Sequence, residues 1–149
     1  MRISLLLAMC LLLISIGLTS SANAIKINIT YPSDGAILQQ TENGDINVRG
    51  TYDEDIPPGQ YLWIFVYHVT NGKYHPQPMP NLEYNYWNTQ AIIGKDKGQF
   101  DIIATLANQG ENNNLVDYLT ENPRVSLGPG LGSIPNGINI YKMIQIIWD

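Results

Sequence analysis

Cysteine is almost missing from this chain of 149 residues. The one cysteine, Cys10, lies inside an apolar run close to the N-terminus. If residues 1–24 are removed, the remaining chain can form no disulfide and offers no thiol chemistry, although an exported protein could use either. We therefore expect side-chain packing alone to stabilise the fold.

Histidine is scarce as well, with His68 and His75 as the two examples. Zinc sites draw mainly on cysteine and histidine ligands, so we predict no metal site and no cofactor. We interpret His68 as a partly exposed strand residue. His75 precedes Pro76, which favours an extended backbone at that position.

The sequence also lacks the pattern of a nucleophilic hydrolase. Beyond residue 24 the serines are Ser33, Ser126 and Ser133, and none of them lies in a G-x-S-x-G motif. The glycines between 127 and 137 are not followed by the G-K-[ST] of a phosphate-binding loop, and we interpret this stretch as an irregular loop. We predict that the protein is not an enzyme. A hydrolase with a carboxylate pair that the sequence does not reveal is an alternative.

Positive charge is limited: eight Lys and Arg stand against thirteen Asp and Glu, for a net charge of −5. The cations are scattered, so we expect neither nucleic acid nor an anionic membrane as a partner. The consecutive acids Asp53, Glu54 and Asp55 lack the alternate spacing of a calcium loop. We interpret them as a solvated turn, with calcium binding left open.

The N-terminus has the composition of a secretory signal. Arg2 precedes an apolar run over residues 3–18, and Ala22-Asn23-Ala24 forms an A-x-A cleavage motif. The run is shorter than the roughly 20 residues of a spanning helix. We predict cleavage after Ala24, one domain over 25–149, and a secreted or cell-surface protein with no membrane contact after cleavage. A retained anchor is the alternative.

Alternating polarity predicts strands over most of the remaining chain. Residues 25–30 place three isoleucines on one face, and residues 45–52 place Asp45, Asn47, Arg49 and Thr51 on the outer one. The apolar run 61–69, which includes Trp63, predicts a strand with both faces covered, followed by a hairpin at Asn71-Gly72. Further strands are expected within 82–93, 99–107 and 138–149.

A single helix is expected over residues 112–123. Leu115, Val116 and Leu119 form one apolar stripe, an asparagine caps the start, and Pro123 ends it. About seven short strands with one short helix before the last strand indicate an all-β, immunoglobulin-like β-sandwich.

Several short motifs follow one another along the chain: "YPSDG" at 31–35, "VRGTY" at 48–52, "IPPGQYLWIFVY" at 56–67, "KYHPQ" at 73–77, Trp87, "FDIIATLA" at 100–107, "DYL" at 117–119 and "IPNG" at 134–137. With this set the chain resembles small immunoglobulin-like or fibronectin type III-like modules of archaeal and bacterial exported proteins. The resemblance spans almost all of 25–149. It implies a two-sheet sandwich, a helix ahead of the final strand and an exported setting, and it carries no catalytic residues.

The segment "NLEYNYWN" provides the candidate ligand-binding residues, Tyr84, Tyr86 and Trp87. Tyrosine and tryptophan offer flat, amphipathic area that stacks on sugar rings or anchors a protein. A lone tryptophan in a sandwich is more often a core residue. Asn28 begins the N-x-[ST] sequon and is a candidate glycosylation site. We predict a non-catalytic interaction or structural module with an envelope protein or a glycan as partner; a small carbohydrate-binding protein is the alternative.

Overall fold

The computed structural model describes residues 24–122 and 128–149. The predicted signal peptide therefore lies outside the described residues, apart from Ala24. The described chain forms nine strands and one helix: β1 (Ile27–Tyr31), β2 (Ala36–Leu38), β3 (Asp45–Tyr52), β4 (Gln60–His68), β5 (Lys73–Pro76), β6 (Asn81–Glu83), β7 (Tyr86–Ile92), β8 (Gly98–Asn108), α1 (Gln109–Glu121) and β9 (Ile138–Trp148).

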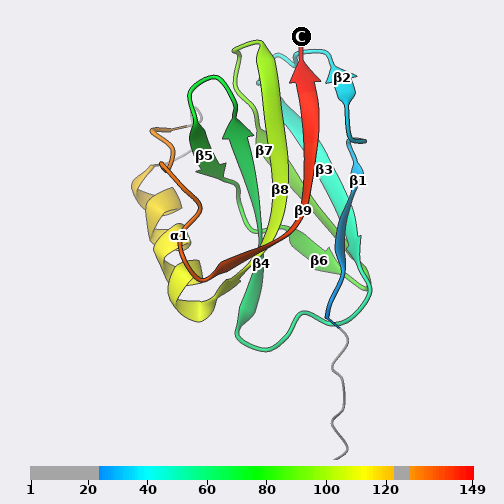
Figure 1. Ribbon diagram of the computed structural model, residues 1–149, viewed down its shortest axis with the longest axis vertical. Coiled ribbons are helices and arrows are strands. Elements are labelled where there is room, and N and C mark those ends of the chain that lie inside the picture. Colours follow the sequence, from blue (N-terminus) through cyan, green and yellow to red (C-terminus); the bar gives the residue numbers. More distant parts are fainter. Residues whose placement is uncertain (1–23, 123–127) are drawn as a thin grey trace, which may run out of the picture.

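The strands form two sheets, with the orders β1-β3-β7-β6 and β2-β9-β8-β4-β5. β2 runs parallel to β9, and every other pair of neighbouring strands is antiparallel. Figure 1 shows the two sheets as layers, with β8 and β9 in front of β3 and β7. The all-β prediction is confirmed. The strand number exceeds the expected seven because β2, β5 and β6 are segments of only three or four residues.

The main hydrophobic core lies between the two sheets, and the alternation in the sequence predicts its members correctly. Ile27 and Ile29 of β1 and Ile46 and Val48 of β3 are buried in it, while their neighbours in sequence point outward. The opposite sheet contributes alternate residues of β8: Phe100, Ile102, Ala104 and Leu106. Apolar burial of this kind is the main stabilising contribution in a chain without disulfides.

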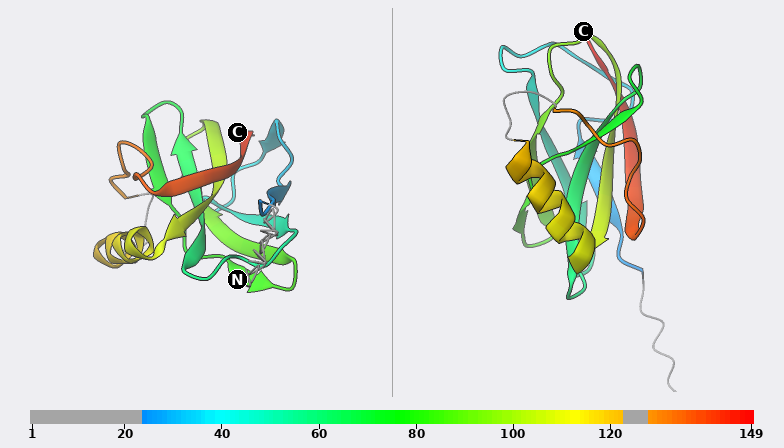
Figure 2. Two further views of the ribbon diagram at one scale, coloured as in Figure 1. Left: turned by 60° about the horizontal axis from the view of Figure 1, so that its bottom comes forward. Right: turned by 90° about the vertical axis from the view of Figure 1, so that its left-hand side faces the viewer.

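A second apolar cluster lies on the other side of the β2-β9-β8-β4-β5 sheet, beneath α1. Trp63 and Phe65 of β4 and Ile103 of β8 pack there against Leu115 of the helix. Figure 2 shows α1 outside the two layers, along one side of the molecule. β4 is thus covered on both faces, as predicted. Trp63 belongs to this second cluster, whereas Trp87 fills the core between the sheets.

The helix differs from the prediction at its start and on its faces. It begins at Gln109 because the side chain of Asn108 accepts a hydrogen bond from the backbone N–H of Glu111 and caps it directly after β8. Val116 is exposed, and the buried residues are Asn112 and Leu115. Leu115 and Leu119 pack in the cluster beneath the helix as predicted, whereas Val116 was wrongly included in the stripe and Asn112 occupies a buried position instead. Within residues 24–122 and 128–149, no helix has the length and apolar character needed to cross a membrane.

The segment 82–93, where one or two strands with an uncertain register were expected, contains most of β6 and all of β7 with a turn between them. Asn85 has a φ of 61°, a left-handed conformation that asparagine tolerates better than most residues. The chain reverses there, so Leu82 pairs with Trp87 and Glu83 pairs with Tyr86. Leu82 and Tyr86 consequently lie on opposite faces of the sheet, because the alternation does not continue through a turn.

Candidate functional site

The outer face of the β1-β3-β7-β6 sheet carries an unusual set of side chains. The register places their residues in rows across the four strands; Arg49, for example, lies between Tyr31 and Asn88. All of them are exposed or half-buried. We call this surface the amide face and define it by Asn28, Tyr31, Asp45, Asn47, Arg49, Thr51, Asn81, Glu83, Tyr86, Asn88 and Gln90.

Four asparagines of the amide face make no side-chain hydrogen bond within the described part of the chain: Asn28, Asn47, Asn81 and Asn88. Other asparagines have visible structural roles. The carbonyl oxygen of Asn71 accepts from Lys73 in a turn, and Asn108 caps α1. Asparagine is disfavoured in strands, so four free amides on one sheet face are not explained by the folding of that sheet.

The amide face has little charge. The four strands contain no lysine, and their single cation is Arg49. Arg49 makes no ion pair with any described residue, and its guanidinium lies 5.7 Å from the centre of the Tyr31 ring. Such a cation–π contact orients both groups without neutralising the charge. The guanidinium N–H groups therefore stay available to a ligand.

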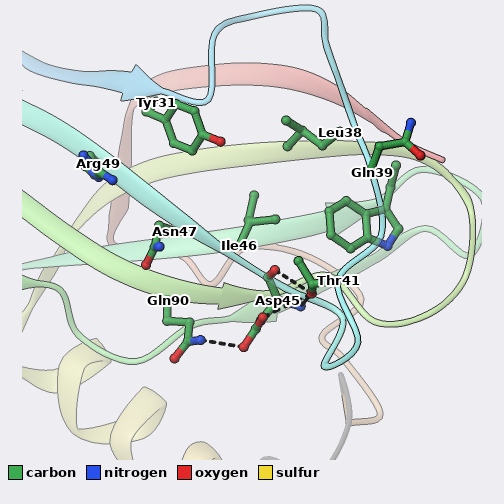
Figure 3. A pocket seen from close by; sticks show the side chains of 10 residues that line it. Tyr31, Leu38, Gln39, Thr41, Asp45, Ile46, Asn47, Arg49 and Gln90 are labelled. Atoms are coloured by element: carbon green, nitrogen blue, oxygen red, sulfur yellow. Dashed lines mark hydrogen bonds between the residues drawn. The ribbon is translucent and has the colours of Figure 1, made fainter.

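A pocket of about 360 Å³ opens at one end of the amide face. In Figure 3, Tyr31 and Arg49 lie toward one end of it and Leu38 and Gln39 toward the other. Its remaining lining residues are Thr41, Asp45, Ile46, Asn47, Gln90 and Trp148.

The segment that follows β2 forms one wall of this pocket, and hydrogen bonds fix its position. The backbone N–H of Gln40 donates to the carbonyl of Asp149 at 3.1 Å, and Asp149 donates back to the carbonyl of Leu38 at 2.9 Å. The indole N–H of Trp148 donates to the carbonyl of Gly94 at 3.0 Å. These contacts tie the end of β9 to the neighbouring loops, so the pocket is largely formed before any ligand binds.

Asp45 is the one carboxylate of the pocket lining, and two neighbours orient it. The hydroxyl of Thr41 lies 3.2 Å from one carboxylate oxygen, and the amide nitrogen of Gln90 donates to the other. Both contacts are drawn in Figure 3. The backbone N–H of Asp45 also donates to the Thr41 hydroxyl oxygen at 2.9 Å. The carboxylate is therefore held in one orientation beside Asn47.

The structure separates the three candidate residues of the segment "NLEYNYWN". Tyr84, in the turn, is 86% exposed, and Tyr86 on the amide face is 61% exposed. Trp87 is only 1% exposed, since the register turns it toward the core opposite Gly50. Trp87 is consequently a core residue and no ligand contact, whereas the two tyrosines are accessible.

His68 is buried, which corrects the prediction of a partly exposed residue. It belongs to the inner face of β4 and packs against Phe100, with ring centres 4.5 Å apart. Neither of its ring nitrogens has a hydrogen-bonding partner among the described residues. His75 is also buried and lies across from Val66, so the two histidines do not face each other directly.

The acids at 53–55 are all exposed, and Asp53 has a structural contact. Its carboxylate accepts a hydrogen bond from the backbone N–H of Lys26 at 2.6 Å. In the described ranges, no three or more His, Cys, Asp or Glu side chains are grouped so that they could hold a metal ion.

A second hollow, of about 330 Å³, lies at the opposite end of the sheets. Residues 56–62 form one side of it, and Met79, Pro80 and Leu82 form the other. Neither this hollow nor the pocket beside Asp45 contains a pair of carboxylates of the kind that a glycoside hydrolase requires.

The pocket residues were not among the candidates derived from the sequence. They come from the ends of β1, β2 and β9, the β2–β3 connection, β3 and β7, which no local motif connects. The available signal was weaker: asparagine at outward positions of predicted strands, where it is disfavoured. Asp45, Asn47 and Arg49 were correctly predicted to point outward, and their meeting with Tyr31 and Gln90 required the sheet register.

No protein-family model matches the chain, and the search of curated proteins found no match.

Proposed function

We propose that this protein is a non-catalytic, immunoglobulin-like binding module that acts outside the cytoplasm and binds its partner through the amide face. The order of the strands supports the immunoglobulin-like part of the proposal. In that fold one sheet has the order A-B-E-D and the other contains C-F-G. The orders β1-β3-β7-β6 and β4-β8-β9 follow the same pattern.

Two features depart from antibody-type domains. Such domains have a disulfide between strands B and F and a tryptophan of strand C that packs on it. Here the core between the sheets holds Trp87 of β7, Phe100 of β8 and Trp148 of β9 among aliphatic side chains, and Trp63 of β4 packs beneath α1. The helix occupies the connection between the strands in the F and G positions. The module would thus be a disulfide-free variant of the fold.

The composition of the amide face is the observation that carries the binding proposal. Protein interfaces are enriched in tyrosine and arginine and depleted of lysine, and antibody paratopes are rich in tyrosine and asparagine. The face presents Tyr31, Tyr86, Arg49 and four asparagines that make no internal side-chain hydrogen bond in the described chain. A sheet face kept only for solubility does not need four asparagines, because asparagine is disfavoured in strands.

The test measures binding of the purified, labelled protein to isolated envelopes of its native cells. We expect saturable binding that Tyr86→Ala with Asn88→Ala weakens at least about tenfold, since two contacts of roughly 1 kcal/mol each would be lost. The matched control carries Asn114→Ala with Val116→Ala on the exposed side of α1 and should bind like wild type. Equal binding by all three proteins, or no saturable binding, would refute the proposal.

A further inference from the structure

The pocket at the end of the amide face has the size of a single small ligand group. Small-molecule pockets range from about 300 to 1,000 Å³. A volume of about 360 Å³ stands at the lower end of this range. It suits one ring-sized unit, and the rest of a longer ligand would extend over the sheet toward Tyr86.

The ionic groups of the lining argue for a ligand without net charge. Asp45 supplies one carboxylate and Arg49 supplies one guanidinium, so their charges cancel. A phosphate or carboxylate ligand would be attracted by Arg49 and repelled by Asp45, and a cation the reverse, so neither gains a net electrostatic advantage over a neutral ligand. A neutral ligand with several hydroxyl groups fits both groups, because one hydroxyl can donate to the carboxylate while another accepts from the guanidinium.

The lining also contains two amide side chains, and an amide can both donate and accept hydrogen bonds. The side chain of Asn47 makes no hydrogen bond with described residues, so its carbonyl and NH₂ are both available. Gln90 uses its nitrogen on Asp45, and its carbonyl oxygen has no donor in the described chain. Amides donate and accept at once. Together with Asp45 and Arg49 they form a set suited to several neighbouring hydroxyl groups.

An aromatic ring and aliphatic groups complete the pocket. The Tyr31 side chain is 47% exposed, with the Arg49 guanidinium 5.7 Å from the centre of its ring. Leu38 and Ile46 contribute apolar surface to the same lining. Flat amphipathic rings stack well on partners that are apolar on a face and polar at the rim.

From this combination we infer that the pocket binds the ring of a neutral sugar, as a free saccharide or as the end unit of a glycan. Sugar rings have a C–H face that matches Tyr31 and a rim of hydroxyls that matches Asp45, Asn47 and Gln90. The inference rests on the proposed function, because it assigns a ligand class to one end of the same amide face.

Nuclear magnetic resonance titration of the ¹⁵N-labelled protein tests the assignment. The neutral probes are glucose, galactose, mannose and N-acetylglucosamine, and the anionic probes are N-acetylneuraminic acid and inorganic phosphate. We expect at least one neutral probe to shift the amide resonances of residues 45–49 and 90, with no shift from the anionic probes. Asn47→Ala and Gln90→Ala should each weaken binding about fivefold or more. Asn139→Ala, which removes an exposed asparagine from β9, is the matched control.

Each contrary result has a distinct meaning. Shifts caused only by the anionic probes would overturn the neutral-sugar assignment. Neutral-sugar binding that neither pocket variant weakens would overturn the assignment to this pocket. If no neutral probe binds while envelope binding still depends on Tyr86 and Asn88, the sugar inference fails and the proposed function stands. If envelope binding is also absent, both fail.

Discussion

Gly50 and Trp87 lie directly opposite each other on β3 and β7, and the indole of Trp87 occupies the space that a side chain at position 50 would need. A Cβ added to Gly50 would overlap the six-membered part of that ring and the carbonyl oxygen of Asn28. Trp87 is completely enclosed in the core as a result.

This relationship predicts a severe effect of Gly50→Ala. The new methyl group must displace Trp87 or the β1 backbone, and overpacking of this kind costs about 3 kcal/mol. Denaturant unfolding measures the loss. Gly132→Ala is the control, because a Cβ at Gly132 has no atom within 4 Å. A double variant with Trp87→Phe should lose less than the sum of the single variants, since the smaller ring vacates part of the space. Strict additivity would contradict the proposed clash.

The buried hydrogen bond between α1 and β4 yields the second prediction. The indole N–H of Trp63 donates to the side-chain oxygen of Asn112 at 3.0 Å, within an otherwise apolar cluster. Asn112→Leu leaves that N–H without its partner and should lower the free energy of unfolding by about 1–3 kcal/mol, even though leucine is apolar. Asn114→Ala, on the exposed side of the same helix, should change it by less than about 0.5 kcal/mol. Equal effects of the two changes would show that the contact contributes nothing.

The sequence was most informative where burial follows a simple period. The alternation in 25–30 and 45–52 predicted which side chains face the core, because a strand with one covered face must alternate. The same reasoning failed at Asn112 and at Asn85. A buried asparagine is satisfied by a partner 49 residues away, and a turn resets the alternation, and neither fact is visible in local polarity.

The candidate site was less accessible to prediction than the fold. Tyr84 and Tyr86 were recognised as exposed aromatics, but the pocket depends on Tyr31, Asp45 and Gln90 coming together from three strands. Strand order and register determine whether these residues come together, and both are properties of the whole sheet. The feature of the sequence that pointed to this site was the number of asparagines at outward positions of predicted strands.

His68 gives a prediction with the opposite sign to the first two. Its ring packs on Phe100, and neither nitrogen bonds to a described residue, so burial removes polar atoms from water without a protein partner in return. His68→Phe should raise the free energy of unfolding by about 1 kcal/mol or more, because an aromatic ring of similar shape replaces the polar one. His68→Ala, which empties the same space, should destabilise the protein. A destabilising His68→Phe would show that a ring nitrogen has a functional or solvent partner.

Asn28 is both a candidate N-glycosylation site and a residue of the amide face. It is exposed, begins the sequon Asn28-Ile29-Thr30, and lies across from Thr51, which in turn pairs with Tyr86. In an N-glycosylating expression host we expect one glycan at Asn28, which mass spectrometry detects and Asn28→Gln removes. Because the glycan is bulky and stands in the row of Tyr86, the modified protein should bind native envelopes more weakly than the unmodified wild-type protein from a host without N-glycosylation. Equal binding with the glycan fully attached would place the partner's contact surface away from this row.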